Sequence, residues 1–526
     1  MKIYHIIAAL AILGTASCSL LEEKPYGKLP SDGFFASAQD LDASLNALYS
    51  VVATSQGQNN YIGTNFLSGD DISTHPASNK QPLREYDQYS VSDNNSWMAT
   101  LWEQRFKVIK AANFVINNAE RTPDVSEQEI QQAIAQAHFW RAYSYFYLVT
   151  TWGRVPVMLE EKIDYGAPLQ SEEDIYRLIL SDLEEAEKGC PVKYSREPYV
   201  QNGVNVAVSQ GAVKAAMAYV YMCMAGWPLN KGEEYYSLAA AKAHEVIDAA
   251  EQGTYSYRLL ENFSDIHSVA YSRSNPELIL GVYYNRDRTP QMTPLTDFLL
   301  EMGGWGDTQG EIRFWKEFPE GPRKDATYFP KVMLGGVLQD WWYDTEPASR
   351  EVVAPVFMKS AEPAAVGVEF DYTSGAACPQ YGEKTIQVIR LSQVYCWYAE
   401  ATGRSGQVTQ DAVDALNKVR NRADGFQSNI YTTSMTAEEL AEAAYDEHGW
   451  ETAGYYWSGF ATRSRDMFRM YRFKDHFEYR KQNMEIEVAP GIFRKEAISV
   501  SGTWDDNMMY SPYPYGDTAL NPGLKR

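Results

Sequence analysis

Cysteine and histidine are scarce in this chain of 526 residues, which holds five cysteines and seven histidines. Four cysteines, Cys190, Cys223, Cys378 and Cys396, form no C-x-x-C pair, and no histidine belongs to an H-E-x-x-H pattern. A zinc site therefore lacks the ligand spacing it needs, and we expect no metal and no cofactor. We expect buried free thiols, although an oxidising compartment permits a disulfide such as Cys190 with Cys378.

Long apolar runs are missing after residue 13. A transmembrane helix needs about 20 consecutive apolar residues, so we expect no membrane span. The one apolar run, Ile6 to Leu13, follows Lys2 and precedes small residues and Cys18, which is the layout of a cleavable lipoprotein signal. We expect residues 1–17 to be removed and Cys18 to be acylated, an attachment that is stable because several acyl chains bury many methylene groups.

Basic residues are outnumbered, with 47 Lys and Arg against 69 Asp and Glu and a net charge of −22. An acidic surface repels the phosphate backbone, so a nucleic-acid partner is excluded. Neutral and cationic ligands remain compatible with this charge.

Catalytic patterns are also absent. A glycosidase needs two carboxylates that face each other across the bond they cleave. The pairs Asp70-Asp71 and Asp505-Asp506 are adjacent in sequence, and neighbouring side chains usually point apart. We therefore expect a binding protein and no enzyme.

Helical periodicity is abundant in the first half of the chain. Leu41, Leu45, Leu48 and Val52 recur at helical spacing. We predict helices over Ala38–Val52, Trp97–Glu120, Ser126–Thr151, Ser171–Lys188, Ser209–Ala225 and Tyr235–Ala250. The last two flank the breaker Gly226-Trp227-Pro228, and a pair of this length is typical of a tetratricopeptide-like helical hairpin.

A similar hairpin is predicted late in the chain, with helices over Ile386–Thr402 and Thr409–Arg422. One hairpin cannot bury its apolar face alone, so several must stack into a scaffold. We expect a mainly α fold with this scaffold at about 38–250 and 386–480. Residues 18–526 are expected to form one domain, because no Pro/Gly/Ser-rich linker divides them.

The segment of about 259–384 has little helical periodicity and is rich in Gly, Pro and aromatic residues, with a short predicted strand over Leu278–Tyr284. Long irregular segments on a rigid scaffold usually carry function, so this loop-rich part is the predicted binding region. The tail from Met508 to Arg526 is predicted to be non-helical as well.

Several motifs resemble those of one family. Trp102, Ile109 and Asn113 are spaced as in its tryptophan-to-asparagine helix. The other matching segments are Phe139-Trp140-Arg141-Ala142-Tyr143 through to Gly153-Arg154-Val155-Pro156, Arg390-Leu391-Ser392-Gln393-Val394-Tyr395 followed by Ala399-Glu400-Ala401, Asn417-Lys418-Val419-Arg420-Asn421-Arg422-Ala423, Pro322-Arg323, and Asn521-Pro522. Together they span nearly the whole mature chain and resemble the SusD/RagB-like family of outer-membrane nutrient-binding lipoproteins. The chain departs from the family pattern at Glu447-His448-Gly449-Trp450-Glu451 and over Tyr455–Arg465.

This resemblance implies a cell-surface, lipid-anchored protein that captures oligosaccharide or polysaccharide fragments. It also implies a SusC-like TonB-dependent transporter as the partner, over which the protein closes like a lid. An alternative from another class is a structural lid or adaptor of the transporter that handles a non-sugar nutrient such as peptide.

Sugar binding requires flat aromatic faces, together with amides, carboxylates or Arg that bridge hydroxyl groups. Such residues cluster before the Trp102 helix and in the irregular middle. The candidate glycan-binding residues are Tyr86, Asn95, Trp97, Tyr283, Trp305, Trp315, Trp341 and Trp342. Each ring suits a half-buried core position equally well. Trp341 and Trp342 are adjacent in irregular chain, so we expect at least one of them to be an exposed platform.

Other large side chains are predicted to be structural. Trp102, Trp140, Trp152, Trp227 and Trp397 lie on predicted helical motifs and are assigned to the core. Arg141 and Arg390 also lie on these motifs, where a buried guanidinium requires a partner. We expect each to pair with a helix carboxylate, for which Glu400 is a plausible partner type.

Overall fold

The computed structural model describes most of the chain. The described residues are 33–58, 69–162, 164–195, 197–284, 304–334, 336–343, 352–359, 384–454 and 459–525, together with the backbone of 291–292 and 381–382. The predicted signal peptide, Cys18 and Cys378 lie outside them. Within this part of the chain, no helix combines the length and the hydropathy that a membrane span requires.

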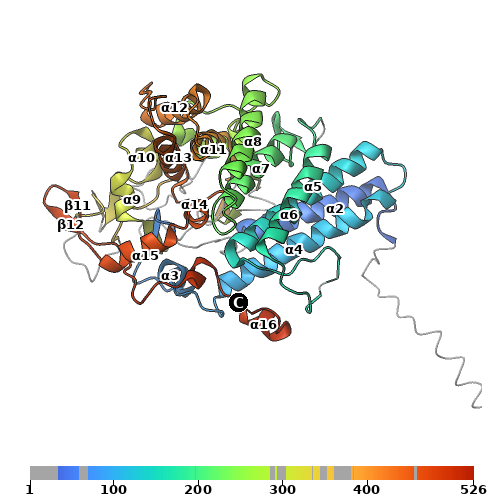
Figure 1. Cartoon of the computed structure of the whole chain (residues 1–526), viewed down its shortest axis with the longest axis horizontal. Helices are drawn as coiled ribbons and strands as arrows, with labels where there is room; N and C mark the ends of the chain where they lie inside the picture. Colours follow the sequence, from blue (N-terminus) through green and yellow to red (C-terminus); the bar gives the residue numbers. More distant parts are fainter. Residues whose placement is uncertain are drawn as a thin grey trace, which may run out of the picture.

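The helices divide into two groups by their order in the chain (Figure 1). The first group comprises α2 Ala38–Ala53, α3 Gln81–Asp87, α4 Ser96–Asn118, α5 Glu127–Trp152, α6 Glu172–Gly189, α7 Gln210–Ala225 and α8 Glu233–Glu251. The second comprises α9 Ile312–Glu317, α10 Pro322–Thr327, α11 Leu391–Arg404, α12 Gln410–Asp424, α13 Ala437–Thr452, α14 Arg463–Arg469, α15 Phe473–Gln482 and α16 Tyr515–Leu520. Helix α3 of the first group lies next to α15 of the second. All six helices predicted in the first half are confirmed.

Short two-stranded antiparallel sheets connect the helices. Their strands are β1 Ile72–Thr74 with β6 Thr308–Gly310, β2 Val200–Gln201 with β3 Val204–Asn205, β4 Leu278–Val282 with β10 Ile386–Arg390, β5 Gln291–Met292 with β9 Tyr381–Gly382, β7 Val332–Leu334 with β8 Val337–Gln339, and β11 Ile486–Ala489 with β12 Ile492–Arg494. The mainly α fold with an irregular part and short strands is therefore confirmed.

Consecutive long helices pack side by side, from α4 through α8 and then on to α11. Helix α5 packs against both α4 and α6. Its N-terminus carries a capping box, in which the Ser126 hydroxyl and the Glu129 carboxylate each accept from the other residue's backbone N–H. Buried side chains then occur all around the helix, including Trp140 and Trp152, as the core assignment of these tryptophans predicted.

The hairpin of α7 and α8 forms as predicted. Ala216, Ala239 and Ala243 are buried between helices, and their small side chains allow close approach. Gly226 ends α7 because the backbone of α14 passes directly beside it. A Cβ at this position would lie 2.2 Å from the Arg469 carbonyl oxygen, and that carbonyl accepts a hydrogen bond from Trp227 N at 2.8 Å.

One predicted helix begins too early. Residues Ile386–Arg390 form strand β10, and helix α11 begins only at Leu391. The β-branched residues Ile386, Val388 and Ile389 are buried and favour an extended strand. Strand β4 supplies the pairing partner, a contact more than 100 residues away that local periodicity does not reveal.

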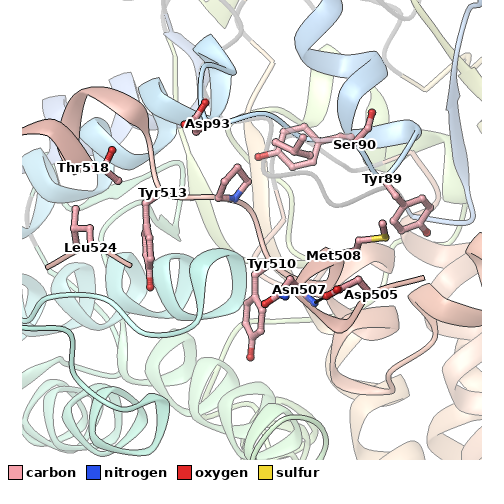
Figure 2. A pocket seen from close by; sticks show the side chains of 13 residues that line it. Tyr89, Ser90, Asp93, Asp505, Asn507, Met508, Tyr510, Tyr513, Thr518 and Leu524 are labelled. Carbon is pink, nitrogen blue, oxygen red and sulfur yellow. Dashed lines mark hydrogen bonds between the residues drawn. The ribbon is translucent and has the colours of Figure 1, made fainter. Parts of the chain in front are cut away.

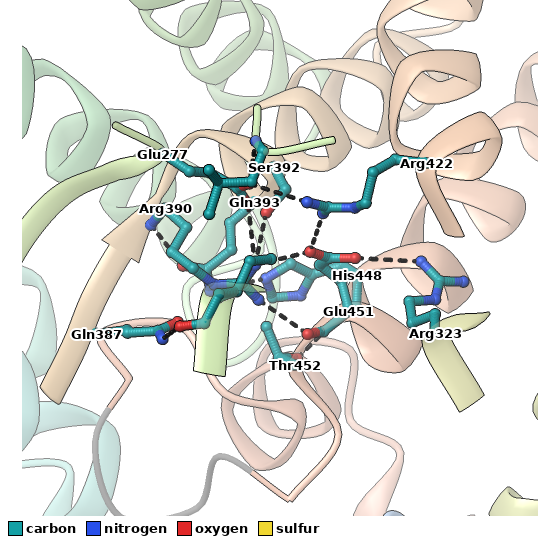
Figure 3. Close-up of polar contacts among 12 residues, drawn as sticks. Glu277, Arg323, Gln387, Arg390, Ser392, Gln393, Arg422, His448, Glu451 and Thr452 are labelled. Atoms are coloured by element: carbon teal, nitrogen blue, oxygen red, sulfur yellow. Dashed lines mark hydrogen bonds and ion pairs between the residues drawn. The ribbon is translucent and has the colours of Figure 1, made fainter. Parts of the chain in front are cut away.

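A buried network of charges holds the second helix group together (Figure 3). The predicted ion pair of Arg390 is confirmed, with Nη1 at 3.1 Å from Glu277 Oε1 and 2.7 Å from Glu451 Oε1. Arg422 and Arg323 also bind Glu451. Burial alone would raise the pKa of Glu451, but these three guanidinium groups outweigh it and hold the pKa well below its usual range.

The ion pair predicted for Arg141 is confirmed as well, because its Nη2 lies 2.7 Å from Asp182 Oδ1. Glu400 pairs with neither Arg141 nor Arg390, so that assignment is wrong. Its carboxylate binds Arg469 Nη2 at 2.6 Å and Arg404 Nε at 2.7 Å.

The C-terminal tail is bound to the first half of the chain. Ser511 N donates to Thr151 O at 2.8 Å, and Trp152 Nε1 donates to Pro512 O at 2.9 Å. The prediction of an entirely non-helical tail is wrong, since it contains the short helix α16. Three of the predicted free thiols, Cys190, Cys223 and Cys396, are free and buried, as expected.

Candidate functional site

The β1–β6 pair brings together two segments that the sequence predicts to bind ligand. Ile72 pairs with Gly310 and Thr74 with Thr308, so the chain before α3 lies beside the chain that contains Trp305. His75 N extends the pairing by donating to Asp307 O at 2.8 Å. An aromatic residue from the irregular middle is thereby placed against polar groups of the early loop.

Trp305 is half-buried, and the Lys80 ammonium lies 4.8 Å from its ring centroid. A cation over an aromatic face is an attractive contact that also fixes the orientation of the ring. Two residues further on, Asp307 is buried and accepts a hydrogen bond from the Ser78 hydroxyl. Lys80, Ser78, Trp305 and Asp307 therefore form one small patch, which we call the Trp305 patch.

Asp307 has unused hydrogen-bonding capacity. Its Oδ2 has no hydrogen-bond partner among the described residues, and this oxygen is buried because the residue as a whole is only 3% exposed. Burial raises the pKa of this carboxyl, with Ser78 and Lys80 acting in the opposite direction. A buried acceptor that lacks a partner is costly, so this oxygen gains a hydrogen bond from any ligand hydroxyl that reaches it.

A second aromatic group lies beyond β6. Trp315 on α9, Trp341 and Trp342 contact one another, with ring centroids 5.4 to 5.6 Å apart. Trp341 is buried in a small core, Trp342 is half-buried, and the exposed ring is the next one, Tyr343, at 66% exposure. The pair thus offers a partly exposed ring in Trp342, and the neighbouring ring of Tyr343 is more exposed than either tryptophan.

Other predicted contacts have structural partners. The Tyr86 ring is buried and its hydroxyl lies 3.0 Å from Ser511 Oγ. Asn95 is the buried N-cap of α4, accepting from Trp97 N and Met98 N and donating to Pro82 O and Glu85. Every polar side-chain atom of Asn95 is thus engaged within the protein.

Two further candidates are half-buried. Trp97 lies in the first turn of α4 and packs against the main core. Tyr283 follows β4, and burial raises the pKa of its hydroxyl. Of the eight candidates, the structure brings Trp315, Trp341 and Trp342 into mutual contact and sets Trp305 into a patch of its own.

The two carboxylates of the Asp70-Asp71 pair have different partners. Asp70 accepts from Arg463, with Nε at 2.6 Å from Oδ1, whereas Asp71 accepts from Gly454 N. Burial, and then the charge of Asp70, raises the pKa of Asp71 to about 6. Among the described residues, no group of three or more His, Cys, Asp or Glu side chains is placed to hold a metal ion.

Sequence reasoning missed Lys80 and Asp307 because neither belongs to an aromatic cluster. Their partners, Trp305 and Ser78, are contributed by segments about 230 residues apart in the chain, joined only by the β1–β6 register. The proximity of Asp307 to Trp305 in sequence was the one available signal.

Comparison with known proteins supports a single class. Residues 19–222 match a family described as starch-binding and associating with the outer membrane, and residues 367–526 match the SusD family. A SusD-like protein of Bacteroides ovatus is 23% identical over 99% of this chain and 96% of its own length. SusD-like protein P2 of Formosa agariphila is 28% identical over 54% of this chain, and that match spans 53% of the relative's length.

Solved structures show the same fold. A protein crystallised with xylogluco-oligosaccharide matches with a TM-score of 0.70 at 20% identity, covering 92% of this chain and 98% of its own. Surface glycan-binding protein A from Bacteroides uniformis matches with a TM-score of 0.69 at 20% identity, covering 93% and 99%.

The helical scaffold with its loop-borne aromatic groups is thus that of an outer-membrane-associated glycan-binding protein, a class that binds its ligand without catalysis. The chain belongs to the SusD/RagB family.

Proposed function

We propose that this protein captures oligosaccharide at the cell surface through the Trp305 patch and delivers it to a SusC-like TonB-dependent transporter. The observation that carries the proposal is that the half-buried Trp305 lies two residues before Asp307, whose Oδ2 has no hydrogen-bond partner among the described residues. A half-exposed indole offers a flat apolar face to the C–H face of a sugar ring, and the carboxylate oxygen accepts from a sugar hydroxyl. Trp342 and Tyr343, which follow β6 in sequence, provide a second aromatic surface.

The structure of a relative that holds xylogluco-oligosaccharide supports this ligand class, which makes that oligosaccharide the first probe. Titration calorimetry of the purified protein against xylogluco-oligosaccharide and other neutral oligosaccharides tests the proposal. We expect Trp305→Ala to weaken binding at least about tenfold, or about 1.4 kcal/mol, without changing the unfolding midpoint. Tyr165→Ala, which removes an exposed ring on another loop, is the matched control.

The delivery step and the anchor have their own tests. We expect the protein to co-purify with a SusC-like barrel, and Cys18→Ser to release it from the outer-membrane fraction because no acyl chain is attached. If the protein co-purifies with the barrel but binds no saccharide of a broad panel, the adaptor of a non-sugar nutrient replaces the glycan-capture proposal.

A further inference from the structure

A hollow lies between the connection from α3 to α4 and the C-terminal tail (Figure 2). Its volume is about 570 Å³, within the roughly 300–1,000 Å³ that small-molecule sites occupy. None of its lining residues belongs to the Trp305 patch. The hollow is therefore a separate place on the molecule, formed by two segments more than 400 residues apart in the chain.

Four tyrosines line this hollow: Tyr86, Tyr89, Tyr510 and Tyr513. Their hydroxyl groups are all bonded within the protein, to Ser511 Oγ, His476 Nδ1, Glu172 Oε1 and Arg154 O. Each ring is held at both ends, by its backbone and by its hydroxyl, and loses little freedom when a ligand arrives. Tyr86, Tyr89 and Tyr513 are only 3%, 6% and 6% exposed and form the rigid base of the hollow, whereas Tyr510 is half-buried and presents more of its ring.

The polar groups of the hollow lie at its rim. Ser90, Asp93, Asp505 and Asn507 are exposed lining residues, and two of them carry a carboxylate. No lysine or arginine is among the residues that line it. An anionic ligand would therefore meet two negative charges without a compensating cation, whereas hydroxyl and ammonium groups find acceptors.

We propose that this hollow is a second saccharide-binding site, selective for sugars without negative charge. The half-buried ring of Tyr510 offers an apolar surface to the C–H face of a pyranose ring, and the carboxylate and amide groups of the rim accept its hydroxyl groups or the ammonium of an amino sugar. The ligand class follows from the lining of the hollow itself, so the proposal stands independently of the Trp305 patch. A protein with two such sites holds a longer glycan at two points and gains avidity where the glycan spans both.

Hydrogen–deuterium exchange of the whole protein locates the binding. The probes are cellobiose, the β-1,4-linked glucosamine disaccharide, and digalacturonate, all at neutral pH. We expect the first two to slow exchange in residues 86–93 and 505–513, and digalacturonate to leave these segments unchanged. Slowed exchange confined to other segments, or equal protection by digalacturonate, overturns the proposal.

Two variants make the result specific. Ser90→Trp adds a large side chain at the rim and should abolish protection by both disaccharides, whereas Ser50→Trp, at an exposed serine of α2, should not. Asp93→Lys should lower the affinity for the glucosamine disaccharide at least about tenfold more than the affinity for cellobiose. Asp411→Lys, on α12, is the control for this variant. Undiminished protection in both Ser90→Trp and Asp93→Lys overturns the proposal. Slowed exchange in residues 75–80 and 304–310 reports on binding at the Trp305 patch. It neither supports nor contradicts binding in the hollow.

Discussion

Arg390 Nη1 lies 2.7 Å from Glu451 Oε1, and both side chains are almost completely removed from solvent. Arg390 precedes α11, whereas Glu451 is near the end of α13, so the contact joins two helices of the second group. Arg422 of α12 and Arg323 of α10 bind the same carboxylate. Four elements thus converge on one buried charge, and their relative positions depend on it.

We expect Arg390→Met to lower the free energy of unfolding by about 3 kcal/mol, because the buried carboxylates of Glu277 and Glu451 then share one guanidinium group fewer, although Arg422 still contacts both. Urea titration followed by circular dichroism measures the change. Lys188→Met is the matched control, since its partner Glu185 is exposed and such pairs contribute little. A loss no larger than that of the control would contradict a structural role for the network.

Glu311 should make stability depend on pH. Burial outweighs the nearby Arg480 and raises the pKa of Glu311 to about 7. A carboxyl whose pKa is higher in the folded state than its usual value of about 4.5 binds its proton more tightly when folded. The stability it contributes is therefore present at low pH and is lost as pH rises from about 4.5 through about 7.

Glu311→Gln removes this titration, so its free energy of unfolding should fall less than that of the native protein between about pH 5 and pH 7.5. The difference should reach at most about 3 kcal/mol. His476, which bonds to Glu311, stays neutral over this range because burial lowers its pKa to about 3. Glu317→Gln, at an exposed position of α9, should show the same dependence of unfolding free energy on pH as the native protein. If Glu311→Gln also shows the native dependence, Glu311 is not the group that titrates.

Asp307 should contribute to glycan affinity through its carboxylate. We expect Asp307→Ala to weaken oligosaccharide binding about tenfold to a hundredfold, because a hydrogen bond to a charged acceptor contributes about 1.5–3 kcal/mol. Calorimetry with an oligosaccharide that binds the native protein measures this effect. Asp340→Ala, which removes a carboxylate paired with Lys331, is the control. Native affinity in a folded Asp307→Ala protein would exclude Asp307 from the site.

Gly226 and Gly516 form a matched pair for substitution. Gly226→Ala places a methyl group 2.2 Å from the Arg469 carbonyl oxygen, so α7 and α14 must separate, and we expect a clear fall in the thermal unfolding midpoint. Gly516 lies in α16 with open space around it, and alanine there should leave the midpoint unchanged or raise it. Equal midpoints for the two variants would show that the close approach at Gly226 is not required.

The helices were predictable because their signals are local. The leucine spacing of α2, the serine caps of α5 and α6 and the breaker Gly226 act within a few residues. The strand over Ile386–Arg390 was mispredicted because its partner Leu278–Val282 is remote. Helix α16 was missed because Pro512, Pro514 and Pro522 flank a six-residue segment that is too short to show periodicity.

The candidate site was predictable only in part. Composition indicated which aromatic residues lie in irregular chain, and Trp305 and Trp342 are indeed only half-buried. It did not indicate that Asn95 caps the N-terminus of α4 or that Trp341 is buried by its neighbours. Both outcomes depend on tertiary packing. The tyrosines of the tail were likewise not predicted as a lining, because they acquire that role only by lying against α3 and α4.

The tail is synthesised long after the helix end to which it is hydrogen-bonded. Residues 511–513 are made some 360 residues after the strip of chain at 151–154 that they cover. Until they arrive, the indole of Trp152 lacks its acceptor and the aromatic end of α5 stays uncovered. A chain truncated before Ser511 therefore lacks these three hydrogen bonds and leaves the aromatic end of α5 without the cover that the tail supplies.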